Sequence, residues 1–390
     1  MRGAATSTLR FGAVYSAIFL GSGAVAPYIP VWFEDRGLNG AQIGLILALP
    51  MLARTFTAPA LALWADRFAL RRTPLALLAL VTAAAYAALA PPLGFLGYAL
   101  LWFVAATLFG ALPPLTDVVV LARARQEGFD YGWPRGIGSA AFIVANVAAG
   151  ALLVAAGPDS VLVWIVVSAL LTALSAQLLM PPDRVATHEA PRRLADQLSG
   201  VGELLRTPGY VLAVLAAGLI QSAHSFYYSF SALTWKAQGI SEDLTGVLWG
   251  AGVAVEIGFL WFMEPWRRRV GPEGLLVLGA AASVVRWTAY AFAPPLWLLF
   301  PLQGLHALCY AATFIASLQL AERYSTPANA TAAQMINAAM SGGLLVGLAT
   351  MASGALFDWV GLKGYLLMSV ISLAGLAAAL RLARTSPRRG

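Results

Sequence analysis

Several ionisable side chains lie inside otherwise apolar stretches of this 390-residue chain. They are Arg54, Asp117, Arg135, Glu256 and Arg286, with His224 and His306 in similar surroundings. A charged side chain is costly at the depth of a lipid bilayer, so it normally faces a protein interior or a water-filled path. The pattern therefore indicates a route for a polar substrate or a proton.

The elements that carry these residues are predicted to be membrane-spanning helices. The chain is 59% hydrophobic and only 11% charged, whereas a soluble domain is about 25% charged. A run of about 20 apolar residues spans a bilayer as a helix. We predict an all-α polytopic membrane protein with twelve spans, at residues 10–32, 42–63, 73–90, 96–121, 136–156, 160–180, 209–235, 244–263, 274–291, 295–321, 330–353 and 361–382.

The basic residues fall mainly on one side of this predicted topology. If the N-terminus is cytoplasmic, twenty of the 25 Lys and Arg lie on cytoplasmic segments, and only Arg36, Lys236 and Lys363 lie outside. This positive-inside asymmetry predicts that both termini are cytoplasmic. The net charge of +7 is then a consequence of topology, and we expect no nucleic-acid partner.

The composition also argues against an enzyme. The chain has three histidines and a single cysteine, Cys309, which excludes an internal disulfide and a cysteine-rich metal site. It contains no H-E-x-x-H motif and no paired catalytic aspartates. We therefore expect no catalytic residues, no metal and no cofactor.

The two halves of the chain repeat each other. Gly37, Gly44 and Arg54 have the same spacing as Gly239, Gly246 and Glu256, at an offset of 202 residues. The longest polar stretch separates the halves, which predicts a six-helix bundle at 1–180, a cytoplasmic central loop at 181–208 and a second six-helix bundle at 209–390. Two parallel six-helix repeats around a midplane site are the architecture of the major facilitator superfamily.

The predicted loop between the second and third helices, Ala62 to Arg72, resembles the cytoplasmic signature of that superfamily. The resemblance implies that Asp66 and Arg67 belong to a cytoplasmic gate, in which the Asp latches neighbouring helix ends. Alanine replaces both glycines of the signature, at Ala62 and Ala69. Simple anchoring of the loop by its arginines is the alternative.

Four further segments resemble the 3-phenylpropionic acid permease group, a relative of the lactose permease group of proton symporters. They are Pro114 to Asp117, Asp130 to Phe142, Gln221 to Ala232 and Val284 to Trp287, in order on the expected helices. The resemblance implies a bacterial inner (plasma) membrane protein, and we expect it to be a monomer in the lipid bilayer.

Comparison with lactose permease bears on the mechanism. Asp117 and Arg135 look like the acid and arginine that bind sugar in that permease. Arg286 and His306 resemble its helix 9 arginine and helix 10 histidine. Cys309 stands where the permease has a glutamate that is central to proton release, so the proton relay is expected to differ.

The charges favour an organic anion as substrate. Arg54, Arg135 and Arg286 give three positive charges, against two negative charges, and an aryl carboxylate would balance them. A guanidinium also matches a carboxylate with two parallel hydrogen bonds. Arg135 is our first choice for the carboxylate partner and Arg54 the second. The other expected substrate-binding residues are Asp117, Gln221, His224, Tyr227, Trp287 and His306.

Proton coupling requires a group that titrates between the outward-open and inward-open states. Glu256 is the leading candidate, because a carboxyl group in apolar surroundings releases its proton less readily than one in water. Arg286 is the expected switching partner, and Asp117 a further acid. A permanent structural ion pair is the alternative for Glu256, and His224 and His306 could also carry the proton.

Together these features predict a secondary transporter that works by alternating access. We expect proton-coupled symport of a small aromatic carboxylate such as 3-phenylpropionate. The alternatives are a symporter of a neutral sugar or nucleoside and, more remotely, a membrane sensor that transports nothing.

Overall fold

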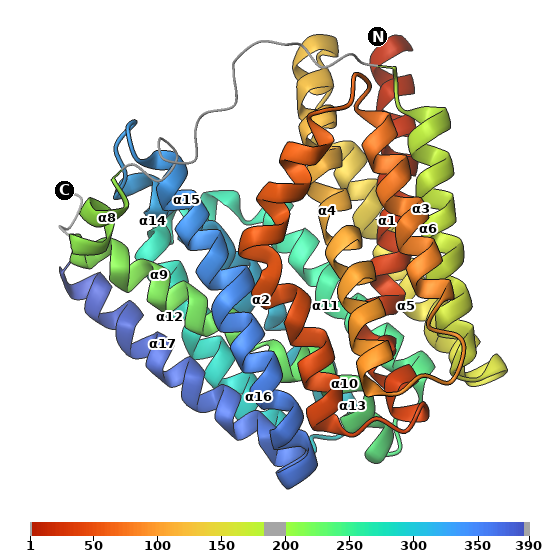
Figure 1. Cartoon of the computed structure of the whole chain (residues 1–390). Coiled ribbons are helices and arrows are strands. Elements are labelled where there is room, and N and C mark those ends of the chain that lie inside the picture. Colours follow the sequence, from red (N-terminus) through yellow and green to blue (C-terminus); the bar gives the residue numbers. More distant parts are fainter. Residues whose placement is uncertain (1, 183–199, 386–390) are drawn as a thin grey trace. The chain divides into compact units, whose positions relative to one another are not determined.

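The computed structural model describes residues 2–182 and 200–385, and all the regular elements in these residues are helices (Figure 1). The predicted central loop at 181–208 lies mostly outside the described residues. Its described end contains a short helix, α8 (Val201–Arg206). The all-helical fold class predicted from the sequence is confirmed.

Contacts divide the described chain into two compact units. Unit 1 comprises residues 2–182 together with Ser231–Gly250, and unit 2 comprises residues 200–230 and 251–385. The end of α10 (Ser225–Ala237) and the start of α11 (Glu242–Phe262) thus group with the first half of the sequence. The predicted boundaries at 180 and 209 stay a prediction.

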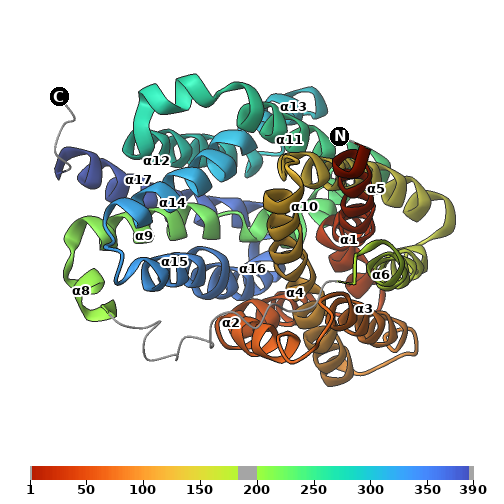
Figure 2. The ribbon, with the colours of Figure 1, turned by 90° about the horizontal axis from the view of Figure 1, so that it is seen from above.

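Six helices from the first half of the sequence build most of unit 1: α1 (Arg2–Asp35), α2 (Gly40–Ala65), α3 (Arg72–Ala87), α4 (Phe95–Glu127), α5 (Gly132–Ala156) and α6 (Asp159–Leu179). The long α1 packs against α5 and α6, and α4 packs against α2 and α3. Figure 2 views α1 and α6 nearly end-on, next to each other.

The remaining helices are all shorter than α1 and α4, and they are more often interrupted. They are α9 (Pro208–Ser222), α10 (Ser225–Ala237), α11 (Glu242–Phe262), α12 (Glu264–Tyr290), α13 (Leu296–Gly304), α14 (Thr313–Arg323), α15 (Ala330–Ala339), α16 (Leu345–Val360) and α17 (Tyr365–Thr385). Two π-helical turns, Ala307–Ala312 and Met340–Leu344, interrupt otherwise continuous helices. Such turns are frequent at functional sites.

Nine helical runs among the described residues are long and apolar enough to cross a membrane. The predicted span at 73–90 corresponds to α3, which has only 16 residues. The last two predicted spans lie in one run, Ala330–Thr385, which the positive φ of Gly361 interrupts. The structure thus supports a polytopic membrane protein, while the count of twelve spans stays a prediction.

Local sequence explains how the helices begin and pack. Asn39 caps α2, because its side chain accepts a hydrogen bond from the Gln42 amide at 2.9 Å while the Gln42 side chain accepts one from the Asn39 amide at 3.1 Å. At Gly138 in α5, an added Cβ would lie 2.6 Å from Phe19 and 2.8 Å from Tyr15 of α1. Small residues therefore allow the close approach of α1 and α5, as expected for helix packing in lipid.

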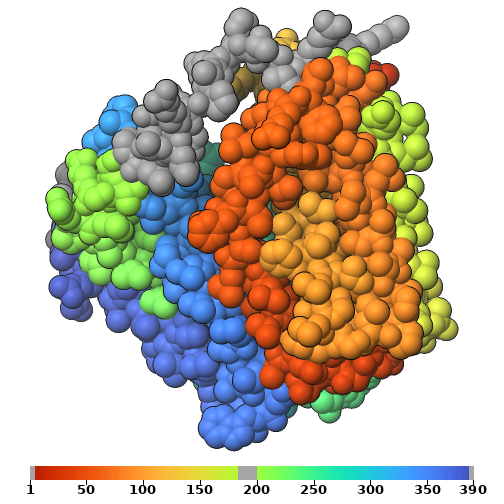
Figure 3. Space-filling model, in the orientation of Figure 1, coloured from red at the N-terminus to blue at the C-terminus, as the bar shows by residue number. Residues whose placement is uncertain are grey.

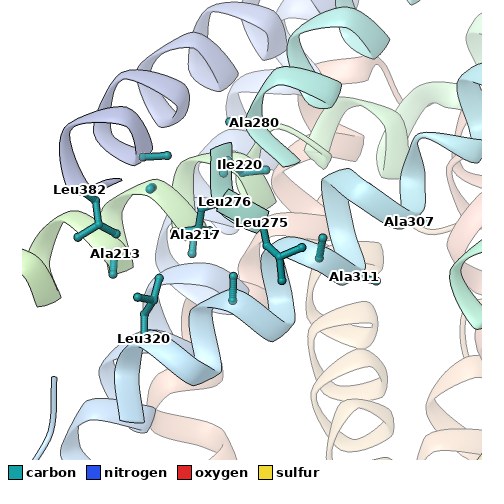
Figure 4. Close-up of a cluster of buried hydrophobic side chains, with 14 of the residues drawn as sticks. Ala213, Ala217, Ile220, Leu275, Leu276, Ala280, Ala307, Ala311, Leu320 and Leu382 are labelled. Carbon is teal, nitrogen blue, oxygen red and sulfur yellow. The ribbon is translucent and has the colours of Figure 1, made fainter. Parts of the chain in front are cut away.

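Alanine dominates the core of unit 2. Figure 4 shows a buried cluster in which Ala217 and Ile220 of α9 lie near Leu276 and Ala280 of α12. Short side chains bring the helix backbones close together and leave few large voids, which replaces hydrophobic burial as the source of cohesion in a bilayer. This rigid packing fixes the polar side chains of the same helices.

Candidate functional site

Arg286 is the centre of a buried polar cluster in unit 2. Its side chain on α12 is fully buried. One terminal nitrogen donates to His306 Nδ1 at 3.1 Å and the other to Gln303 Oε1. The guanidinium also lies 4.5 Å from the ring centre of Trp287 and 4.7 Å from that of Tyr227, distances at which a cation is attracted to an aromatic face.

His306 bridges Arg286 and Glu256. Its Nε2 lies 3.5 Å from a carboxylate oxygen of Glu256 on α11, while its Nδ1 faces Arg286. Arginine can only donate hydrogen bonds, so Nδ1 must be an acceptor and the ring proton lies on Nε2, directed at Glu256. The histidine is therefore neutral in this arrangement. The predicted Arg286–Glu256 partnership runs through His306.

His224 lies beside this cluster on the α9–α10 segment. Its Nδ1 donates to the carbonyl of Ile220 at 3.1 Å. Its Nε2 is buried and has no hydrogen-bond partner among the described residues. The ring centre lies 5.1 Å from that of Trp287 and 5.6 Å from that of His306. A buried acceptor of this kind can bind a donor group of a ligand or a water molecule.

Asp117 is the centre of a second polar cluster, in unit 1. One of its oxygens accepts hydrogen bonds from the hydroxyls of Tyr15 and of Tyr131, the latter at 2.8 Å. Arg135 approaches the same oxygen at 3.4 Å. The Arg135 guanidinium also lies 4.8 Å from the Phe19 ring centre. The charges of Asp117 and Arg135 are thus balanced within unit 1.

The structure brings together most of the predicted site residues of unit 2, because Tyr227, Trp287 and His306 all contact Arg286 or its partners. Gln221 lies near the cluster and donates to the Tyr310 carbonyl at 3.3 Å. Arg54 lies in unit 1. It makes no hydrogen bond or ion pair to the residues that the structure describes.

The predicted gate residue Asp66 forms an ion pair with Arg71, five residues further along the same loop. Arg67 is exposed and forms no ion pair in the described part of the chain. The resemblance to the cytoplasmic signature could not distinguish among the three arginines of the loop, since only its backbone conformation decides which one reaches Asp66.

Two further residues belong to the site through their contacts. Gln303 accepts from Arg286 and donates from its Nε2 to the Tyr227 hydroxyl at 3.0 Å. Tyr131 belongs to the Asp117 cluster, because its hydroxyl donates a hydrogen bond to Asp117. The sequence signal for Gln303 was its place one turn before His306 on an apolar helix.

Polar and charged side chains held among membrane-spanning helices are typical of membrane transporters. The pattern of the MFS_1 like family matches residues 9–367, so the chain belongs to that family, within the major facilitator superfamily. The predicted resemblance to this superfamily and its 3-phenylpropionic acid permease group is thus confirmed. The transporter class, and with it the exclusion of an enzyme, is confirmed as well.

Two relatives match nearly the whole chain. The chain is 28% identical to the "Probable 3-phenylpropionic acid transporter" of Escherichia coli (strain K12) over 92% of this chain and 93% of that protein. It is 29% identical to the "Maltose permease" of Geobacillus stearothermophilus, over 100% of this chain and 98% of that one. One of these relatives is thus named for an aromatic acid and the other for a sugar.

Solved structures agree on the fold. The crystal structure of nucleoside transporter NupG matches with a TM-score of 0.81 at 16% identity, over 97% of this chain and 100% of that chain. A bacterial homologue of the iron transporter ferroportin, in an inward-facing state, matches with a TM-score of 0.71 at 16% identity, over 98% of both chains.

Proposed function

We propose that this protein is a proton-coupled symporter of a small aromatic carboxylate such as 3-phenylpropionate. The observation that carries the proposal is the charge balance inside the spans. Asp117 pairs with Arg135, and Glu256 reaches Arg286 through His306. Arg54 stays without a counter-charge among the described residues. A monovalent organic anion supplies the missing negative charge.

Glu256 is the proton carrier in this proposal. While Arg286 donates to Nδ1 of His306, that ring cannot accept a second proton without losing the bond. Protonation therefore falls on Glu256, where it removes the charge that His306 Nε2 faces at 3.5 Å. A neutral Glu256 loosens its link to Arg286 and permits substrate binding in the outward-open state. Hydration after inward opening releases the proton, as alternating access requires.

A neutral sugar or nucleoside is the second candidate substrate. It is supported by the similarity to a maltose permease and to nucleoside transporter structures. The unpartnered Nε2 of His224 could accept a hydrogen bond from a substrate hydroxyl. Under this alternative, the charge of Arg54 would have a role within the protein itself and would not bind the substrate.

Uptake into proteoliposomes separates these functions. Labelled 3-phenylpropionate is offered with an imposed inward proton gradient, a protonophore control, and unlabelled lactose and a nucleoside as competitors. Gradient-dependent accumulation that only aryl acids block supports the proposal. No uptake of the acid, together with transport of a neutral competitor, refutes it in favour of the sugar or nucleoside function.

A further inference from the structure

We propose that the groove between α2 and α4 in unit 1 is a carboxylate-binding site, in which the guanidinium of Arg54 and the hydroxyl of Thr107 hold the acid group of the substrate. The identity of the ligand rests on the proposed function. The position of the site rests on the geometry of these two helices, whose side chains lie next to each other on the face shown in Figure 3.

Arg54 occupies a position where a lone charge needs a partner. It lies 14 residues after Gly40, the first residue of α2, or about 21 Å along the helix axis. The hydrocarbon core of a bilayer is about 30 Å thick, so this guanidinium sits too deep to reach either surface easily. An arginine at such a depth normally faces a water-filled cavity or a counter-charge.

A cavity of about 210 Å³ opens beside Arg54. Both helices line it, with Met51 and Thr57 on α2 and Trp102 and Thr107 on α4 among its walls. Most of the remaining lining is apolar, which suits the hydrocarbon body of an aryl acid. Small-molecule sites commonly combine such walls with a few convergent polar groups.

Thr107 gives an independent indication of a ligand. Its hydroxyl oxygen is buried and has no hydrogen-bond partner among the described residues. Buried hydroxyls are nearly always satisfied, and in a membrane helix the Thr side chain commonly bonds to its own backbone. Thr116 on the same helix does so, at 2.8 Å from the Leu112 carbonyl. The Thr107 hydroxyl is therefore available to form a hydrogen bond with a polar group of a ligand in the cavity.

The internal repeat of the sequence gives Arg54 an equivalent residue in the second half of the chain. Arg54 corresponds to Glu256 at the offset of 202 residues. In unit 2, Glu256 finds a partner in His306 on the chain between α13 and α14. In unit 1, the cavity lining from α4 includes Thr107 and Trp102 but no acidic side chain. The repeat has therefore kept an ionisable side chain at this position, with opposite charge, but Arg54 has no ion-pair partner among the described residues.

Arg135 fits this role less well. It is the fourth residue of α5 and so lies within the first turn or so of the helix end. Its charge is met by Asp117 at 3.4 Å and by the faces of Tyr15 and Phe19. A carboxylate at Arg135 would have to displace Asp117 or lie against a like charge. Binding at Arg54 carries neither cost, so Arg54 replaces Arg135 as our first choice for the partner of the substrate carboxylate.

Ligand-induced thermal shifts of the purified full-length protein test the site. Benzoate and 3-phenylpropionate are each compared with their neutral amides, in the wild type and in variants. We expect each acid to raise Tm more than its amide. Arg54→Gln should raise the apparent Kd of the acids about 10- to 100-fold, and Thr107→Val about 3- to 10-fold. Arg54→Lys should retain part of the acid preference, because it keeps the charge.

Two comparisons make the outcome decisive. Arg36→Gln removes an arginine of the same unit that pairs with Asp159, and should keep the acid preference. Arg135→Gln tests the competing assignment. The inference is overturned if Arg54→Gln keeps the acid preference, if only Arg135→Gln loses it, or if the wild type never prefers an acid to its amide.

Failure of the inference and failure of the proposed function give different results. If the wild type accumulates 3-phenylpropionate but Arg135 sets the acid preference, the transport proposal stands and the site is wrong. If the wild type transports only a neutral solute and still prefers acids through Arg54, the site stands as an anion site and the proposed substrate is wrong.

Discussion

The Nε2 atom of His306 lies 3.5 Å from the carboxylate of Glu256, and the opposite nitrogen of the same ring faces Arg286. An acid and a base that would otherwise form a direct ion pair are thus separated by one neutral imidazole. The imidazole transmits a change of charge on Glu256 to Arg286, because any shift of its Nε2 moves Nδ1 with it. This arrangement underlies two of the predictions below.

Replacing Glu256 with Gln should uncouple transport from the proton gradient. The amide cannot take up or release a proton, but it keeps a similar shape and a hydrogen-bonding group for His306. We expect exchange of labelled for unlabelled substrate to continue, while uphill uptake falls at least about tenfold, to the level of the protonophore control. Counterflow and gradient-driven uptake in the same proteoliposomes measure the two activities.

Glu264→Gln is the matched control, since this acid is exposed and pairs with Arg268 one helical turn away. It should leave both activities close to wild type. Continued accumulation by Glu256→Gln under a proton gradient would assign the proton to another group, such as Asp117 or His224.

Replacing Gln303 with Glu should stabilise the protein and weaken coupling. Gln303 Oε1 already accepts from Arg286, so a carboxylate of nearly the same shape would give this buried guanidinium a direct counter-charge. The bond from Arg286 is already charge-assisted, so the expected gain comes from the attraction between two opposite charges in the protein interior, less the cost of burying the new carboxylate. We expect a net gain of about 1 kcal/mol and a higher Tm. Arg286 would then depend less on Glu256, and the dependence of uptake on the proton gradient should fall.

Gln303→Leu provides the contrast. It leaves a terminal nitrogen of Arg286 without its acceptor, and a buried unsatisfied donor costs about 1–3 kcal/mol. Its Tm should therefore fall. If Gln303→Glu lowers Tm as much as Gln303→Leu does, the view of Arg286 as a cation lacking a direct counter-charge is wrong.

Gly138→Ala should destabilise unit 1 and disturb the Asp117 cluster. The added methyl group would lie 2.8 Å from Cβ of Tyr15, an atom that cannot move without α1. Overpacking of this kind costs about 1–3 kcal/mol. Thermal unfolding in detergent measures the loss, and Gly258→Ala on α11 is the control, because nothing lies within 4 Å of an added Cβ there. Equal Tm values for the two variants would contradict the close packing of α1 and α5.

The Asp66–Arg71 ion pair should matter for rate more than for stability. The two side chains are 48% and 26% exposed, and exposed pairs contribute only about 0.2–1 kcal/mol. We expect Asp66→Asn and Arg71→Gln to leave Tm nearly unchanged and to slow counterflow several-fold, if the pair holds one state of the transport cycle. Arg67→Gln tests the assignment from the sequence signature. A larger loss of rate with Arg67→Gln than with Arg71→Gln would favour the pairing of Asp66 with Arg67 that the signature implies.

Much of the site was predictable because polar residues inside membrane helices are rare. Glu256, Arg286 and His306 stood out in the sequence for that reason alone, and the resemblance to lactose permease suggested the pairing of Asp117 with Arg135. The contact partner of each of these groups was harder to predict from the sequence. Gln303, Tyr131 and Arg71 acquire their roles from contacts across helices or around a turn, where a rotation of one residue redirects a side chain by about 100°.

The sequence by itself determined the class of this protein. Its apolar runs require helices, since a bilayer offers no partners for open backbone groups, and its repeat and motifs place it in a family of transporters. Only the tertiary structure decided that His306 stands between Glu256 and Arg286, that Arg135 is already paired with Asp117, and that Arg54 faces a cavity. Charges can be counted along a chain, but which of them neutralise one another depends on distances between helices that packing alone sets.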